Sequence, residues 1–201
     1  MKKFTAVFLS ILIIAFSFTA CSSKPNNKLT EKNINNTIDT AFSALREFDS
    51  ATVKTYVESS TLDTILTYAA KKEQFKKLGV AMFENLDYEI TAYDIDNRTI
   101  TLAVKNKDLS EVASEYTKNL LNEYASITGM IQLLKDIKDD NWLNNNLSIL
   151  TKGINAAAMK DEEVEIKLSF EQKKDRLVFT FTEEAEDAVS GGALTAIKNI
   201  F

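Results

Sequence analysis

The fold is decided by residues 86–104, which read LDYEITAYDIDNRTITLAV. In both halves of this stretch, apolar side chains occupy every second position, the period of a strand with one buried face. The positions expected to face inward are Leu86, Tyr88, Ile90, Ala92, Ile100, Leu102 and Val104. Turn-forming residues, Asp94-Ile95-Asp96-Asn97, separate the halves, so the stretch predicts an antiparallel hairpin. The same four residues begin like a calcium loop, but the Gly and distal Glu of such a loop do not follow, and we expect turn chemistry there.

Helices are predicted before this hairpin, because apolar residues return there every three or four positions. A first helix begins near Thr30, and its inward stripe is Ile34, Ile38, Ala41, Phe42, Leu45 and Phe48. Asp49-Ser50 interrupts the stripe and starts a short second helix. Ser60-x-x-Asp63 resembles a capping box and starts a third helix, whose C-terminal part would carry the lysines at 71, 72, 76 and 77.

After the hairpin we expect a long helix, a short helix, a second hairpin and a closing helix. The long helix is capped by Asp108 and Glu111 and kinked at Gly129, and its inward face would hold Val112, Tyr116, Leu120, Tyr124, Ile127, Ile131 and Leu134. The polar run 136–146 would end it, and residues 147–158 would form the short helix. Residues 164–170 and 177–181 alternate again and predict two strands. An acidic helical turn over 183–187 precedes a helix break at Gly191-Gly192.

These elements predict an α+β fold, in which a curved antiparallel sheet of about four strands, arranged as two hairpins, packs against helices. The hydrophobic signal is continuous from Ile34 to Ile200, and we find no internal repeat. We therefore expect one domain over residues 33–201.

Residues 1–20 have the pattern of a secretory signal peptide. Lys2 and Lys3 give a positive start, an apolar run follows to Phe18, and the small residues Thr19-Ala20 close it. The tetrad Phe18-Thr19-Ala20-Cys21 resembles the lipobox of bacterial lipoproteins, with Phe18 where Leu is usual. The resemblance implies cleavage between Ala20 and Cys21 and attachment of fatty acids such as palmitate through Cys21. An unmodified cysteine after an ordinary signal peptide is the alternative.

A lipidated Cys21 would place the chain at the extracytoplasmic face of the cell membrane. Residues 21–32 hold the only proline and little apolar mass, so they would form the lipidated end and a flexible tether. Frequent Lys, Asn and Ile with scarce Gly and Pro favour a Gram-positive source with an AT-rich genome.

Composition excludes several kinds of chemistry. The 201 residues contain no histidine and one cysteine, so the chain has no imidazole base, thiolate zinc cluster or intrachain disulfide. We expect no metal and no cofactor. Loss of residues 1–20 removes two lysines and no acidic residue, which takes the formal charge from −5 to −7. Such an acidic domain argues against a nucleic-acid partner and against electrostatic attachment to anionic lipid.

Three short motifs carry a family resemblance. Residues 82–90 (MFENLDYEI), residues 104–109 (VKNKDL) and Gly191-Gly192 resemble Gram-positive lipoproteins of the nuclear transport factor 2-like superfamily, which are cystatin-like in architecture. The resemblance covers most of residues 33–201 and implies a sheet that wraps into a cone, often around an apolar pocket. Residues 135–160 are longer and richer in asparagine than a minimal member needs.

The candidate site residues are aromatic. Tyr88 and Tyr116 share inward stripes with Phe42, so these three would line a pocket if the cone is open. Trp142 lies among asparagines 141, 144, 145 and 146, a combination that can stack on a sugar or bind a partner; a tryptophan that fixes a loop to the core is the structural alternative. Asp87, Glu89 and Glu165 alternate outward along their strands, so we predict no catalytic residue.

We therefore expect a membrane-anchored, non-enzymatic lipoprotein that binds an apolar small ligand or an envelope protein. A small isomerase- or hydrolase-like enzyme that uses a carboxylate and a tyrosine is one alternative. A passive structural protein of the envelope is the other, and it predicts neither a pocket nor an exposed apolar patch.

Overall fold

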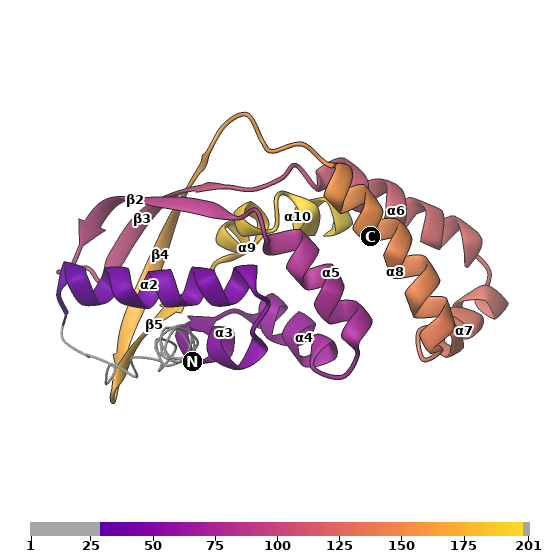
Figure 1. Ribbon diagram of the computed structural model, residues 1–201, viewed down its shortest axis with the longest axis horizontal. Coiled ribbons are helices and arrows are strands. Elements are labelled where there is room, and N and C mark those ends of the chain that lie inside the picture. Colours follow the sequence, from indigo (N-terminus) through magenta and orange to yellow (C-terminus); the bar gives the residue numbers. More distant parts are fainter. Residues whose placement is uncertain (1–28, 199–201) are drawn as a thin grey trace, which may run out of the picture.

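The computed structural model describes residues 29–198, and over this range the chain is α+β, with nine helices and five strands (Figure 1). The elements before the first hairpin are α2 (Glu31–Arg46), α3 (Ser50–Tyr56), β1 (Val57–Glu58), α4 (Ser60–Ala69) and α5 (Glu73–Phe83). Those that follow are β2 (Asp87–Asp94), β3 (Thr99–Lys105), α6 (Ser110–Glu123), α7 (Ile127–Asp136), α8 (Asp140–Ala156), β4 (Val164–Lys173), β5 (Arg176–Thr180), α9 (Glu183–Val189) and α10 (Ala193–Lys198).

The five strands form one sheet in the order β1-β5-β4-β3-β2. The two predicted hairpins, β2–β3 and β4–β5, are both present and are joined by an antiparallel β3–β4 pair. The sequence did not reveal the fifth strand, β1. Its two residues pair in parallel with β5, Val57 opposite Phe179, so the sheet is mixed.

One face of the sheet is buried beneath helices. The inward side chains of β3 and β4, such as Leu102 and Leu168, are fully buried, whereas Lys167 on the opposite face is exposed. α2 lies along the buried face, and the space between is filled by large rings: Phe42, Phe48, Phe83, Phe170 and Phe179. We call the sheet with α2–α5 and α9 the body.

A register shift between Ile90 and Ala92 moves the following side chains of β2 to the opposite face of the sheet. Ala92, which the alternation predicted to point inward, is exposed, and the neighbouring Tyr93 packs against the core instead. The Tyr93 hydroxyl donates a hydrogen bond to Oδ1 of Asn35 on α2. A bulge of this kind shifts the period by one residue, which a strict alternation does not anticipate.

The single long helix predicted after the hairpin is two helices. α6 ends at Glu123, and α7 begins at Ile127 after a turn in which the Ser126 hydroxyl accepts a hydrogen bond from the Gly129 amide at 2.9 Å. Gly129 permits close packing: a Cβ there would lie 2.9 Å from the backbone of Tyr124. Apolar residues continue at intervals of three to four positions across this turn, so the periodicity alone predicts one uninterrupted helix.

Two further helix boundaries differ from the prediction. A helix ends where the polar run 136–146 begins, as predicted, since α7 stops at Asp136, but α8 already starts within the run at Asp140 and includes Trp142, with Asp139 accepting a hydrogen bond from the Trp142 amide. The third predicted helix stops at Ala69, so Lys71 lies in a turn and Lys76 lies on α5. The Asp139 side chain caps the start of α8, whereas α5 begins after Lys72 without a side-chain cap.

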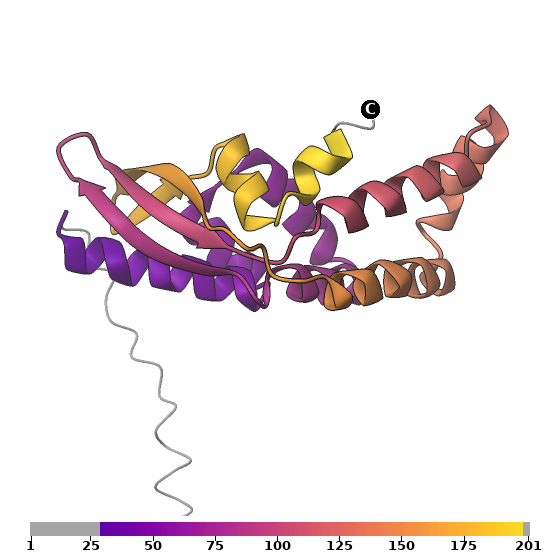
Figure 2. The same cartoon turned by 90° about the horizontal axis from the view of Figure 1, so that it is seen from above.

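Helices α6, α7 and α8 form an arm that extends away from the sheet (Figure 2). α6 and α8 diverge toward α7, which joins them at the far tip of the molecule. The first residues of α2 lie at the opposite end, beside the turn between β2 and β3 (Figure 1). The described chain is therefore elongated, with its N-terminal end remote from α7.

Candidate functional site

The three motifs that carry the family resemblance meet where the arm joins the body. This junction consists of residues 105–109, 157–160 and 189–192. The amide of Leu109 donates to the Gly191 carbonyl at 2.9 Å, the amide of Asp108 to the Ala158 carbonyl at 2.8 Å, and the amide of Lys160 to the Asn106 carbonyl at 2.9 Å. Segments far apart in the sequence are thereby fixed at one point.

Asn106 is the central side chain of the junction and is only 1% exposed. Its Nδ2 donates to the carbonyls of Met82, at 3.0 Å, and Val189, at 2.7 Å, while its Oδ1 accepts from the Lys107 amide at 2.8 Å. Met82 and Val189 lie at the C-terminal ends of α5 and α9, where helix carbonyls lack partners within the helix. One amide side chain therefore caps two helices.

Gly191 allows the chain to pass close to β3's exit. Its φ is +67°, and a Cβ there would lie 2.0 Å from the Lys107 carbonyl oxygen. Gly192 also has a positive φ, +87°, but a Cβ there would lie no closer than 3.4 Å to its neighbours. The predicted helix break is confirmed, since α9 ends at Val189 and α10 begins at Ala193.

The junction holds the arm to the body. A second, smaller apolar core lies beside it. Ala81, Leu109, Ala113, Ile154 and Ala193 form a second apolar cluster from α5, α6, α8 and α10. Lys107 is buried in the junction, and its ammonium lies 3.8 Å from the Glu84 carboxylate and 3.4 Å from the Asn155 carbonyl. The motifs thus account for architecture, because their conspicuous residues, Asn106, Lys107 and Gly191, are engaged in contacts within the junction.

At the far tip, a chain of polar side chains holds the three arm helices together. The Trp142 indole N–H donates to the Tyr124 hydroxyl at 3.0 Å, and that hydroxyl donates to Asp136 at 2.9 Å. Gln132 donates to the other Asp136 oxygen at 2.6 Å. Burial, reinforced by the bond to Asp136, raises the pKa of Tyr124. The chain links the end of α6, the end of α7 and the start of α8.

The side chain of Trp142 therefore helps to hold the arm helices together. Its ring packs edge-on against Tyr124, with centroids 6.4 Å apart, and its only polar atom is engaged. The Asn146 amide donates to the Trp142 carbonyl, whereas Asn141, Asn144 and Asn145 are exposed along α8. Trp142 is half-buried, and the sugar-stacking role that its sequence neighbourhood suggests stays a prediction.

The three other predicted pocket residues do not form one site. Phe42 is fully buried on α2, and Tyr88 packs on it from β2 with ring centroids 4.2 Å apart. The Tyr88 hydroxyl donates to Asp39 on the outer side of α2, and burial raises the pKa of this tyrosine. Tyr116 lies on α6, in the arm, where it borders an apolar cavity of about 50 Å³ together with Val112, Leu150 and Ile154.

Larger hollows in the described residues lie at the surface. Between α5 and α8, an open groove of about 340 Å³ has Leu143 and Leu147 at its base and Lys77 and Lys152 among its walls. Under the sheet, the space that a cone pocket would occupy is filled by the phenylalanine rings of the body. Of the aromatic residues predicted to line a pocket, Phe42 is a core residue, whereas Tyr88 and Tyr116 are half-buried.

The sequence did not reveal the buried acid of the body. Glu186 was assigned to an acidic helical turn, but it is only 3% exposed. Its carboxylate accepts hydrogen bonds from the Ser59 hydroxyl and, at 3.4 Å, from the Thr61 amide at the start of α4. Ser59 in turn accepts from the Leu62 amide at 2.9 Å. Since both groups accept hydrogen bonds from the first amides of α4, the pair ties α9 to α4.

The most unusual surface of the described chain is the outer side of α7. None of its residues is buried, and its large apolar side chains face solvent. The exposed fractions are 84% for Ile127, 50% for Met130, 53% for Ile131, 60% for Leu134 and 41% for Ile137, which caps the helix. We call these five residues the α7 stripe. The sequence predicted Ile127, Ile131 and Leu134 to face the core, and that prediction is wrong.

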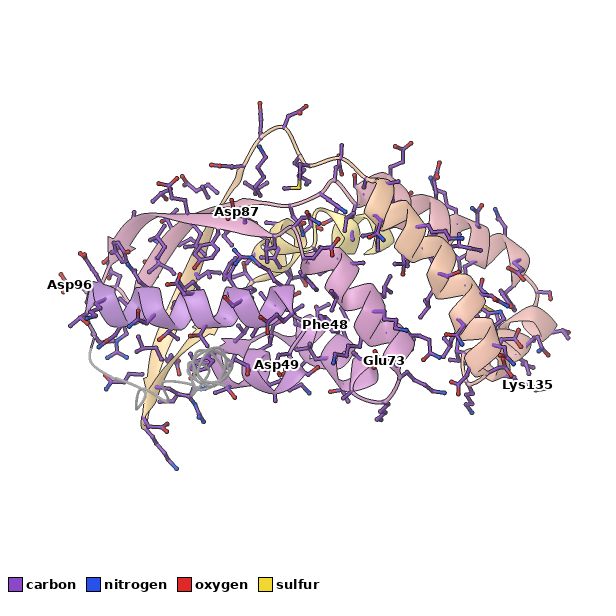
Figure 3. All side chains as sticks on the ribbon, in the orientation of Figure 1. Phe48, Asp49, Glu73, Asp87, Asp96 and Lys135 are labelled. Carbon is purple, nitrogen blue, oxygen red and sulfur yellow. The ribbon has the colours of Figure 1, made fainter. Side chains whose placement is uncertain are left out.

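The reason is the turn before α7. If α6 continued without a break, these residues would lie on the same face as the inward residues of α6. Instead the chain turns at Tyr124–Ser126, and α7 presents them to solvent. Figure 3 shows Lys135, on α7, at one extreme of the molecule and Asp96, in the β2–β3 turn, at the other. Apolar side chains gathered on an outlying helix are typical of a binding surface.

The predicted cleavage and lipidation residues, Ala20 and Cys21, lie outside the described residues, as do all of 1–28. Among residues 29–198 we find no helix with the length and apolar character needed to cross a bilayer, and no cluster of acidic or cysteine side chains able to hold a metal ion. No protein-family model, curated protein sequence or solved structure matches the chain.

Proposed function

We propose that this chain is a lipoprotein, anchored through Cys21 to the extracytoplasmic face of a Gram-positive cell membrane, whose α7 stripe binds a protein. The anchor rests on the leader pattern of residues 1–20 and on the lipobox-like tetrad before Cys21. The binding role rests on one observation, the exposure of the α7 stripe at the tip of the arm.

The positions of the two ends of the molecule support an anchor at the N-terminal end and a binding surface on α7. α2 begins at Glu31, so the body would follow Cys21 after a tether of about ten residues, which spans roughly 30 Å when extended. α7 lies at the opposite end of the molecule from the first residues of α2 (Figure 2). α2 and α8 alone are 16 and 17 residues long, or about 25 Å each. A domain standing on its tether would hold the stripe away from the bilayer.

The filled core favours a protein partner over an apolar small ligand. Phe42, Phe170 and Phe179 are buried under the sheet, and the cavity beside Tyr116, of about 50 Å³, is well below the roughly 300–1,000 Å³ typical of small-ligand pockets. The exposed stripe disfavours a passive structural protein, for which no apolar patch is expected. The enzyme alternative is disfavoured because the buried Glu186 carboxylate is used to cap α4.

For the fold, we propose a distant nuclear transport factor 2-like domain, cystatin-like in its layering. The support is the α+β order, with α2 along one face of a sheet built from two hairpins. The three-helix arm of α6–α8, inserted between the hairpins, would be an elaboration on that plan.

The anchor is tested by metabolic labelling with palmitate in a Gram-positive host. We expect the full chain to take up label and to fractionate with membranes, and we expect Cys21→Ser to take up none. Ser22→Ala, one position further on, is the matched control and should label like the parent chain. Label that persists in Cys21→Ser would overturn lipidation at this residue.

A further inference from the structure

The groove between α5 and α8, which we call the α5–α8 groove, has a polar lining. α5 belongs to the body and α8 to the arm, and the two helices lie side by side (Figure 1). The groove has a volume of about 340 Å³, within the range typical of small-ligand sites. Leu143 and Leu147 at its base are only 1% and 7% exposed, so a ligand would meet polar residues instead. These are Gln74, Lys77, Asn144, Ser148, Thr151 and Lys152.

The lining of the groove is positively charged, although the whole chain has a formal charge of −5. Lys77 and Lys152 line it, no acidic residue does, and neither lysine forms an ion pair within residues 29–198. α5 and α8 carry one acidic residue each: Glu73, which borders a neighbouring hollow, and Asp140, which is paired with Lys72 at 2.6 Å. A hollow lined by charge of one sign attracts ligands of the opposite sign.

The neutral side chains of the groove leave hydrogen-bonding groups for a ligand. Within the described part of the chain, no hydrogen bond engages the side-chain amides of Gln74 and Asn144, each of which can donate and accept. The hydroxyls of Ser148 and Thr151 each donate to a carbonyl of α8, at 2.8 and 2.7 Å, so their oxygens can still accept. This set matches the hydroxyl groups of a sugar or polyol, which also donate and accept.

We infer that the α5–α8 groove binds a sugar or polyol that carries a phosphate group. Lys77 and Lys152 attract the phosphate as point charges, whereas a planar carboxylate is matched best by the fork of arginine, which the groove lacks. An acidic peptide fits less well, because its apolar side chains would find Leu143 and Leu147 already covered. None of the lining residues belongs to the α7 stripe, so the two surfaces are tested separately.

Isothermal titration calorimetry of the chain without residues 1–20 tests this site, with glucose 6-phosphate and glycerol 1-phosphate as probes. We expect at least one probe to bind saturably with a Kd below about 5 mM, and glucose, glycerol and inorganic phosphate to bind at least about five-fold more weakly. Lys77→Met and Lys152→Met should each weaken binding of the preferred probe about five-fold. Lys118→Met, which removes an exposed charge on α6, is the matched control and should bind like the parent chain.

The hydroxyl contacts and the source of the phosphate need two further arms. The double variant Gln74→Ala/Asn144→Ala should bind the preferred probe at least about three-fold more weakly but bind inorganic phosphate as before. Vesicles of phosphatidylglycerol present glycerol phosphate in a lipid head group, so sedimentation with them that Lys77→Met/Lys152→Met abolishes would assign the phosphate to a lipid. Binding to none of these phosphates, binding that both lysine variants leave unchanged, or tighter binding of polyglutamate would overturn the inference.

Discussion

Replacing Asn106 by alanine should lower the free energy of unfolding more than a substitution at an exposed position. The side chain makes three hydrogen bonds, of 2.7, 2.8 and 3.0 Å, and all three are lost in the variant. The carbonyls of Met82 and Val189 and the amide of Lys107 would then be left in a site that admits almost no water, since Asn106 is 1% exposed.

The expected loss follows from the number of bonds. A buried hydrogen bond contributes about 1 kcal/mol net, so three correspond to about 3 kcal/mol of unfolding free energy. For a domain of this size, with a urea m-value near 2 kcal/mol/M, the midpoint should fall by about 1.5 M. Asn106→Asp keeps the shape but sets a carboxylate against two carbonyl oxygens, so it should lose at least as much at pH 7.

Urea unfolding of the chain with residues 1–20 removed provides the assay, followed by far-UV circular dichroism and by the fluorescence of Trp142, the only tryptophan. Asn145→Ala, on the exposed side of α8, is the matched control and should change the unfolding free energy by less than about 0.5 kcal/mol. If Asn106→Ala loses less than 1 kcal/mol, the idea that this side chain caps both helices is wrong.

Two further predictions concern the junction and the tyrosines. Gly191→Ala and Gly192→Ala both place a Cβ at a positive φ, but only the first meets a carbonyl oxygen at 2.0 Å, so it should lose about 2 kcal/mol more in urea unfolding; equal losses would show that the Lys107 contact is unimportant. Burial raises the pKa values of Tyr88, Tyr116 and Tyr124, so the unfolded chain ionises first and stability should be full below about pH 10 and decline above it. In urea midpoints measured from pH 8 to pH 11, Tyr88→Phe should flatten that decline, and an unchanged slope would contradict the role assigned to Tyr88.

Much of the architecture was predictable because it depends on local periodicity. The alternation over residues 86–104 and 164–181 correctly predicted two hairpins, and the apolar stripe of α2 correctly predicted a buried helix face from Ile34 to Leu45. Asp94 and Asn97 form the expected turn, joined by hydrogen bonds of 3.0 and 2.8 Å. These features need only the preferences of neighbouring residues.

Other features depend on contacts between distant residues. β1 is two residues long and is a strand because it pairs with β5. The sequence of Val57–Glu58 therefore contains no pattern that predicts it. Glu186 is polar in sequence and buried in the fold, because the start of α4 supplies its donors. The prediction of one long helix missed the turn at Tyr124–Ser126. The Ser126 cap was a local signal for it, but the segment contains no proline that would mark a helix break.

The sequence by itself determined an acidic composition without histidine and an α+β order of elements, and residues 1–20 carry the pattern on which the proposed leader rests. Only the tertiary structure decided which apolar residues become core. Periodicity states that Ile127, Ile131 and Leu134 share a side of a helix, but it contains no information on what that side meets. The chain reverses before α7, the side turns to solvent, and a predicted part of the core becomes the surface on which the proposed function depends.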